Sequence, residues 1–206
     1  MRFASVRVTW FLSGWILSGL LLASPNNRII CALGSGTATY KPASDERPTS
    51  DAMELAGRVN AAVKSICGSH CPAVALYRNP TAGGVMFIAN GDQARLVYAP
   101  AFFASVHDAA GDAGVFALMA HELGHGLDDV LGAAWVRNTW SPELRADGWA
   151  GCVFAKSGTV GSELAAALAI LAKYPAASHP PWKIRLPVIR TGYTGCGGDG
   201  ARISLH

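Results

Sequence analysis

The spacing of apolar residues from residue 51 onward predicts a helix followed by short strands. Between Asp51 and Ile66, apolar residues recur every three or four positions, as on one face of a helix. Three short runs then predict strands, at Ala73–Tyr77, Val85–Ala89 and Ala94–Tyr98. Turn-forming residues separate these runs, and the second turn, Asn-Gly-Asp, predicts that the last two strands form an antiparallel hairpin.

The pattern changes to a helical one in the second half of the chain. Pro100 is expected to end the sheet, and a helix is predicted from near Asp112. Its buried stripe has five apolar residues spaced three and four apart: Phe116, Met119, Leu123, Leu127 and Val130. Ser141-Pro142 is typical of the start of a second helix, as N-cap and first-turn proline. A third helix, near Ser162–Lys173, is apolar almost all round, and the Gly-rich tail is expected to be irregular.

Composition narrows the class of protein. A chain of 206 residues has room for one domain of ordinary size. Half of the residues are apolar and 15% are charged, which excludes an intrinsically disordered protein. The net charge is +3 and there is no run of Lys or Arg, so no nucleic-acid partner is expected. No apolar run reaches the roughly 18 residues of a membrane span, which excludes a polytopic membrane protein.

The first residues have the composition of a targeting segment. Arg2 and Arg7 precede an uncharged stretch of 14 residues, Trp10–Ala23, which is short for a membrane span and typical of a secretory signal. An uncleaved anchor is the alternative, and its basic flank would keep the N-terminus cytoplasmic. Both alternatives predict an exported domain that is periplasmic, secreted or anchored on the outer side of the cytoplasmic membrane.

The predicted division of the chain has three parts. Residues 1–32 are the signal peptide or N-terminal anchor, residues 33–50 are a flexible linker of Gly, Ser, Thr and Pro, and residues 51–206 are the folded domain. Small residues that suit a cleavage site follow the apolar stretch: Ala23, Ser24 and Ala32. Any association with a membrane would come through the N-terminal part.

Cysteine usage fits export. Cleavage after Ala32 would remove Cys31, the odd one of five cysteines, and the remaining four allow three pairings. A metal or redox site at residues 67–71 is one alternative, but the segment matches neither CxxC nor CxxCH, so a disulfide is expected there. The most economical pairing joins Cys67 to Cys71 and Cys152 to Cys196.

The motif that carries chemistry is His121-Glu122-Leu123-Gly124-His125, an HExxH sequence inside a predicted helix. Two histidines four residues apart point the same way, so both imidazoles can bind one zinc ion. Glu122 can reach a water in the open coordination position and act as its general base. The alternative is an exposed pair of histidines on a surface helix.

A catalytic zinc site needs a third protein ligand. Asp128 and Leu131 stand where the HExxHxxGxxH pattern has its glycine and last histidine, so that variant is excluded. Glu143 and Asp147 lie four residues apart on one face of the next predicted helix. One of them can bind zinc while the other accepts the free ring N–H of a ligating histidine. Small residues would let this helix approach another closely: Ala146, Ala150 and Gly151.

HELGH followed by ELRADGWAG resembles the HExxH…ExxxD arrangement of the gluzincin metallopeptidases. It is most similar to the CAAX prenyl protease and heat-shock membrane protease group, and to small bacterial neutral zinc metallopeptidases. The resemblance covers about half of the chain and implies that Glu143 is the third zinc ligand and that Asp147 supports His121. The fold expected with it is a small α+β zincin, with a short antiparallel sheet packed on the HExxH helix and further helices.

A second match lies downstream. The segment Ser178–Arg185 resembles the HPxxxxR sequence of the same group. There the histidine stabilises the oxyanion, which His179 could do as an imidazolium donor. An ordinary loop histidine is the alternative. Arg185 is expected to pair with a buried carboxylate, with Asp147 as the candidate.

The function expected from these residues is that of an exported zinc metalloendopeptidase. One Zn²⁺, held by His121, His125 and Glu143, would act on a peptide or protein substrate. An edge strand, with Ala94–Tyr98 as the candidate, would line the cleft and pair with an extended peptide. The alternatives are an exported non-catalytic binding protein that retains the zincin fold and zinc site, and a zinc hydrolase of non-peptide bonds.

Overall fold

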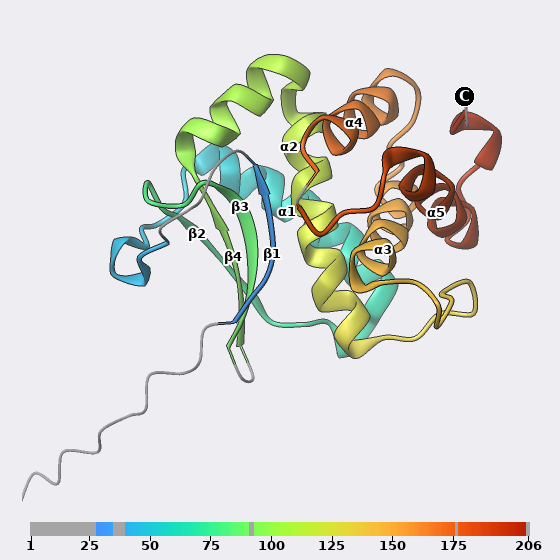
Figure 1. Ribbon diagram of the computed structural model, residues 1–206, viewed down its shortest axis with the longest axis horizontal. Helices are drawn as coiled ribbons and strands as arrows, with labels where there is room; N and C mark the ends of the chain where they lie inside the picture. Colours follow the sequence, from blue (N-terminus) through green and yellow to red (C-terminus); the bar gives the residue numbers. More distant parts are fainter. Residues whose placement is uncertain (1–27, 35–39, 91–92, 176, 205–206) are drawn as a thin grey trace, which may run out of the picture.

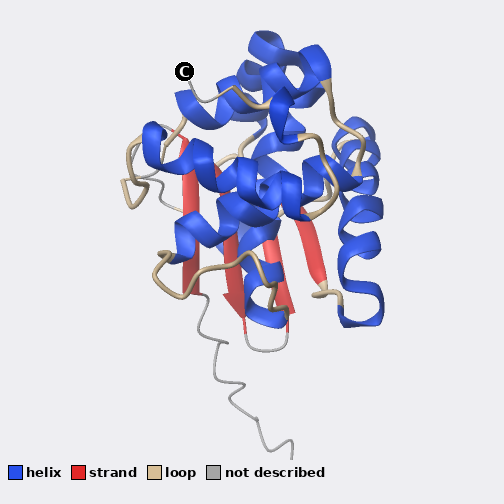
Figure 2. Ribbon diagram, turned by 90° about the vertical axis from the view of Figure 1, so that its right-hand side faces the viewer, coloured by secondary structure: helices blue, strands red, loops and turns tan. Residues whose placement is uncertain are grey.

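The computed structural model describes residues 28–34, 40–90, 93–175 and 177–204. It has an α+β fold in which one four-stranded sheet is covered by helices (Figures 1 and 2). The strands are β1 (Arg28–Gly34), β2 (Val74–Arg78), β3 (Gly84–Asn90) and β4 (Gln93–Tyr98). The α-helices are α1 (Ser50–Cys67), α2 (Pro100–Val130), α3 (Pro142–Lys156), α4 (Gly161–Lys173) and α5 (Trp182–Gly195). Short 3₁₀ helices lie at Pro42–Ser44, Gly68–His70 and Gly200–Arg202.

The sheet is mixed, with the strand order β1-β3-β4-β2. The predicted antiparallel hairpin of β3 and β4 is confirmed, and β1 also pairs antiparallel with β3. Two expectations are wrong: β2 pairs with β4 in parallel, so the sheet is not purely antiparallel, and β4 is an inner strand rather than the edge. Alternating apolar residues indicate that a strand exists, whereas its neighbours are set by contacts far apart in the chain.

Helix α2 begins at Pro100, well before the predicted start near Asp112. Gly111 interrupts it with a left-handed backbone (φ 60°), a conformation that glycine adopts without steric cost. The helix contacts the sheet as well as α1, α3 and α4, and from Gly114 to Leu127 it is buried almost all round instead of along one stripe. Val130, the last residue of the predicted stripe, is exposed.

The helices beyond α2 form a second part of the core. Figure 1 shows α2 between the sheet and the helices α3 to α5, and α3 packs on both α2 and α5. Ser141 caps α3 as predicted, because its hydroxyl accepts a hydrogen bond from the Leu144 amide. The tail from Gly192, predicted to be irregular, continues α5 to Gly195.

The N-terminal boundaries differ from the predicted ones. Strand β1 crosses residue 32, the predicted end of the targeting segment. Residues 40–49, predicted to be a flexible linker, are held against the sheet, because Asp45 accepts hydrogen bonds from the side chains of Tyr40, Asn79 and Arg95. The apolar stretch at 10–23 lies outside the described residues. Among the residues that are described, no helix is long and apolar enough to cross a membrane.

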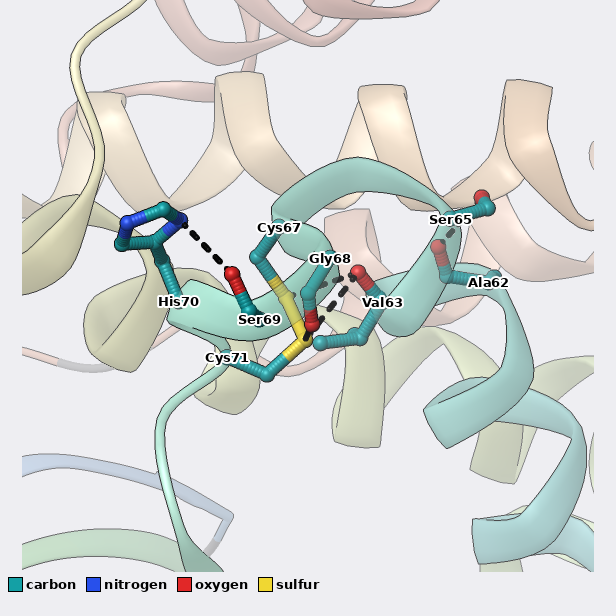
Figure 3. The surroundings of a disulfide bond; sticks show 8 residues. All are labelled: Ala62, Val63, Ser65, Cys67, Gly68, Ser69, His70 and Cys71. Carbon is teal, nitrogen blue, oxygen red and sulfur yellow. Dashed lines mark hydrogen bonds between the residues drawn. A yellow bond between two sulfur atoms is a disulfide. The ribbon is translucent and has the colours of Figure 1, made fainter.

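Both predicted disulfides are present. Cys67–Cys71 closes the turn at the end of α1 (Figure 3), and Cys152–Cys196 joins α3 to the residue that follows α5. Two disulfides indicate folding in an oxidising compartment. Cys31 is free and buried.

The two disulfides should contribute unequally to stability. Their sequence separations are 44 residues for Cys152–Cys196 and 4 for Cys67–Cys71. In the chain-entropy model, replacing both cysteines with alanine lowers the free energy of unfolding by about 4 kcal/mol for the longer loop and about 2 kcal/mol for the shorter one. Urea denaturation of the two double variants beside the parent measures this. A larger loss from the short loop would contradict the expectation.

Candidate metal centre

Helix α2 carries the HExxH residues into the interior of the molecule. His121 and Glu122 have no exposed surface, and His125 is 3% exposed. The two imidazoles lie one helical turn apart, with ring centroids separated by 5.2 Å. The alternative of an exposed pair of histidines on a surface helix is therefore excluded.

The close approach of α3 to α2 brings the carboxylates to the histidines. A Cβ atom at Gly124 would lie 2.5 Å from the carbonyl oxygen of Ala146, so only glycine fits at this crossing. Ala146 therefore lies where α3 approaches α2 closely, as its small side chain predicted. Gly151 also allows a close approach, but to α5: a Cβ there would collide with the backbone of Ile189.

Glu143 reaches both histidines from the first turn of α3. Its Oε2 lies 3.4 Å from the Nε2 of His121 and 3.4 Å from the Nε2 of His125. Two ligands at zinc–nitrogen and zinc–oxygen distances in a tetrahedral site are about 3.4 Å apart. Glu143 Oε2 therefore lies at a separation from each of the two imidazoles that a shared metal ion allows.

Behind His121 lies a buried chain of charged groups. Asp147 Oδ1 accepts a hydrogen bond from His121 Nδ1 at 3.0 Å, and Arg185 donates two hydrogen bonds of 2.8 Å to the Asp147 carboxylate. The guanidinium also donates to the Leu171 carbonyl oxygen at 2.8 Å. Both contacts expected of Asp147 are present. They fix the ring of His121 with Nε2 facing Glu143, which is the orientation a metal ligand needs.

The charged forms of Asp147, Arg185 and His121 stabilise one another. Burial opposes ionisation of Asp147, but hydrogen bonds from Arg185 and His121 outweigh it and lower the pKa of the carboxyl. Burial likewise disfavours a charged His121, but its hydrogen bonds to Asp147 and Glu143 raise the pKa of the imidazole to about 9. A metal ion at Nε2 must displace a proton from this ring, so metal binding releases protons.

The loop before α5 completes the surroundings of Glu143. His179 Nε2 donates to Glu143 Oε2 at 2.7 Å, and Ser178 Oγ donates to Oε1 at 2.7 Å. Burial opposes the charge of Glu143, but the adjacent imidazoles of His121, His125 and His179 and the hydroxyl of Ser178 hold the pKa of its carboxyl well below the ordinary range. Burial also lowers the pKa of His179, which favours a neutral imidazole over the predicted imidazolium.

Two ionisable side chains in the cluster lack hydrogen bonds within the described part of the chain. They are Glu122, at both carboxylate oxygens, and His125, at Nε2. Burial raises the pKa of Glu122 to about 8. Buried polar atoms without partners are rare in proteins, and an ion or a water at the site accounts for them. These atoms fit a cluster that is built around a metal ion.

Cys31 is the residue that the sequence analysis missed. Its Sγ lies 3.5 Å from Glu143 Oε2, 3.8 Å from His121 Nε2 and 4.0 Å from His179 Nε2. Its sulfur also lies within 4.8 Å of ligand atoms of Glu122 and His125. The available signal was its status as the odd cysteine, but the predicted end of the targeting segment placed it outside the domain. The structure thus shows a buried Cys/His/Glu cluster that can hold a metal ion.

Known proteins add nothing to the identification of this cluster. Comparison of the chain with protein-family models, with curated proteins and with solved structures found no match. The case for a function therefore rests on the residues of this chain and their geometry.

Proposed function

We propose that this protein is a zinc-dependent metallopeptidase of the gluzincin type that acts outside the cytoplasm. The observation that carries the proposal is the position of Glu143 Oε2, 3.4 Å from the Nε2 atoms of both His121 and His125, with the buried carboxylate of Glu122 in the same cluster. Two imidazoles and one carboxylate are the protein ligands of a catalytic zinc site that keeps one coordination position open. The predicted export and the two disulfides support a location in an oxidising compartment.

The zinc ion, when bound, would supply an activated water and polarise the scissile carbonyl group. Glu122 would accept the proton of that water and pass it to the leaving amine. A carboxylate suits this role when its pKa is near the working pH, and burial raises the pKa of Glu122 in this direction. Because no hydrogen bond engages either oxygen, the group is available for proton transfer.

The remaining residues would position these groups. Asp147 and Arg185 hold His121 with Nε2 facing the metal position. Ser178 and His179 orient the carboxylate of Glu143. His179 could also donate its Nε2 proton to the developing oxyanion, but it would first have to leave Glu143.

The second candidate is an exported binding protein that uses the metal for structure only. Cys31 favours it, because a fourth protein ligand gives the closed coordination of a structural zinc site. Glu122 favours the peptidase, because a structural site has no use for a buried carboxylate without a hydrogen bond. The two candidates differ in whether hydrolysis accompanies metal binding.

Metal removal and replacement test the proposal. The purified protein should contain one zinc ion per chain and cleave a general peptide library. Dialysis against a chelator should abolish cleavage, and one equivalent of Zn²⁺ should restore it, because the activated water depends on the ion. If the metal-loaded protein cleaves no peptide even after Cys31 has been replaced with alanine, the peptidase proposal fails and the binding protein is favoured.

A further inference from the structure

We propose that β1 is a built-in inhibitory strand, with the Cys31 thiolate as the fourth ligand of the metal site. In this arrangement the strand closes the coordination position that a catalytic water would occupy. The effect on hydrolysis rests on the proposed function, whereas coordination by sulfur does not and can be measured separately.

The geometry of the sulfur is that of a ligand. In a tetrahedral zinc site, a sulfur and a nitrogen or oxygen ligand are about 3.5 Å apart, given zinc–sulfur and zinc–nitrogen bonds of about 2.3 and 2.1 Å. Cys31 Sγ lies 3.5 Å from Glu143 Oε2 and 3.8 Å from His121 Nε2. The Nε2 of His125 and the buried carboxylate of Glu122, which make no hydrogen bond among the described residues, independently fit a metal site at this cluster.

The strand is placed as a bound peptide would be. β1 is an edge strand that pairs antiparallel with β3, and Figure 1 shows it on the side of the sheet nearest α3 and α5. Its register shifts between Ile29 and Cys31, and a bulge of this kind redirects a side chain. Cys31 and Leu33 point inward while Ala32 between them is exposed, so Cys31 is the residue aimed at the cluster.

The strand also closes the site sterically. Cys31 is 4% exposed, and His121 and Glu122 beneath it have no exposed surface. A peptide carbonyl cannot reach Glu122 while the side chains stay in this arrangement. Displacement of β1 would uncover the cluster and the edge of β3, which could then pair with an extended peptide. With β1 displaced, β3 would be the edge strand and would take the role expected of the strand Ala94–Tyr98.

Binding of the Cys31 sulfur to the metal is a ligand exchange and needs no oxidant. When the metal binds, the Cys31 thiol releases its proton to solvent and a sulfur–metal bond forms in place of a water–metal bond. The reverse step returns a proton to sulfur and a water to the metal. The four other cysteines are held in disulfides, so Cys31 is the thiol available for this exchange among the described residues.

The test compares the full-length chain with Cys31→Ala, after mass spectrometry has verified that the N-terminus precedes Arg28. Leu33→Ala is the matched control, because it truncates the other inward side chain of β1 without removing a ligand. X-ray absorption at the zinc edge should show one sulfur at about 2.3 Å in the parent and in Leu33→Ala, and none in Cys31→Ala. A parent spectrum with nitrogen and oxygen ligands only would overturn the proposal.

Access to the metal gives a second readout that does not depend on activity. Each protein is loaded with Co²⁺ and titrated with acetohydroxamate. The visible spectrum should change in Cys31→Ala, where a position is open, and stay unchanged in the parent. Equal changes in the two proteins would overturn closure by β1.

The rate of peptide cleavage then distinguishes the proposed peptidase activity from the proposed inhibition by β1. Cleavage by zinc-loaded Cys31→Ala should exceed that of the parent by about tenfold or more, because the parent would be mostly in the closed state. Sulfur coordination together with an inactive but open Cys31→Ala would support the ligand assignment and count against the peptidase. Equal cleavage by parent and variant would overturn inhibition by β1 while leaving the peptidase in place.

Discussion

Replacing Glu122 with glutamine is expected to abolish peptide hydrolysis and to leave metal content unchanged. The amide has nearly the same shape but cannot accept the proton of the attacking water. Loss of a general base lowers the rate by about 10²–10⁴-fold. Because neither oxygen of Glu122 is hydrogen-bonded among the described residues, the change removes no hydrogen bond from the fold. The measurement is kcat/KM on a cleaved peptide, with zinc content determined on the same samples.

Stability of the metal-free protein provides a control for this substitution. Burial raises the pKa of Glu122 to about 8, above its value of about 4.3 in an unfolded chain. The folded parent should therefore lose stability as the pH rises from the unfolded to the folded pKa, where only the unfolded state has ionised. Glu122→Gln should lack this loss. Glu163→Gln, at an exposed position on α4, should change neither activity nor stability. Full activity in Glu122→Gln would refute the role of the base.

The sequence predicts the parts of the site that lie on one or two helices. The four-residue spacing of His121 and His125 places both on one side of α2 wherever that helix packs. The same spacing keeps Glu143 and Asp147 together on α3. Spacing alone does not choose between them as the metal ligand, whereas the family resemblance does. The Asp147–Arg185 pair also has a sequence signal, because a lone arginine in the matching segment needs a buried partner.

The parts that could not be predicted depend on contacts between distant segments. The parallel pairing of β2 with β4 joins strands that are separated along the chain by β3, so no local pattern records it. Strand β1 is short and follows the apolar stretch of residues 10–23 in the sequence, so its composition resembles the end of a targeting segment more than an edge strand. The position of Cys31 depends on that pairing, because its sulfur reaches Glu143 across 112 residues of sequence.

The second large effect concerns zinc binding by the two carboxylates of α3, Glu143 and Asp147. Glu143→Ala is expected to weaken zinc binding far more than Asp147→Asn, because Glu143 Oε2 faces both imidazoles while Asp147 faces only the far side of His121. In Asp147→Asn the amide oxygen can still accept the Nδ1 proton of His121, so zinc affinity should fall by about 10–100-fold. Loss of the carboxylate also leaves Arg185 buried without its counter-charge, which should lower stability by about 3–5 kcal/mol.

The two substitutions should therefore separate metal binding from stability. Both are best made in the Cys31→Ala background, since the thiolate would otherwise leave Glu143→Ala with three ligands. Competitive zinc titration measures affinity, and urea denaturation of the metal-free proteins measures stability. Glu143→Ala should lose zinc and keep most of its stability, because Glu143 lies in the first turn of α3, where its contacts are with the cluster. Asp147→Asn should keep most of its zinc and lose stability. If Asp147→Asn is metal-free while Glu143→Ala stays loaded, the ligand is Asp147 and the geometry of the bound site differs from the one described.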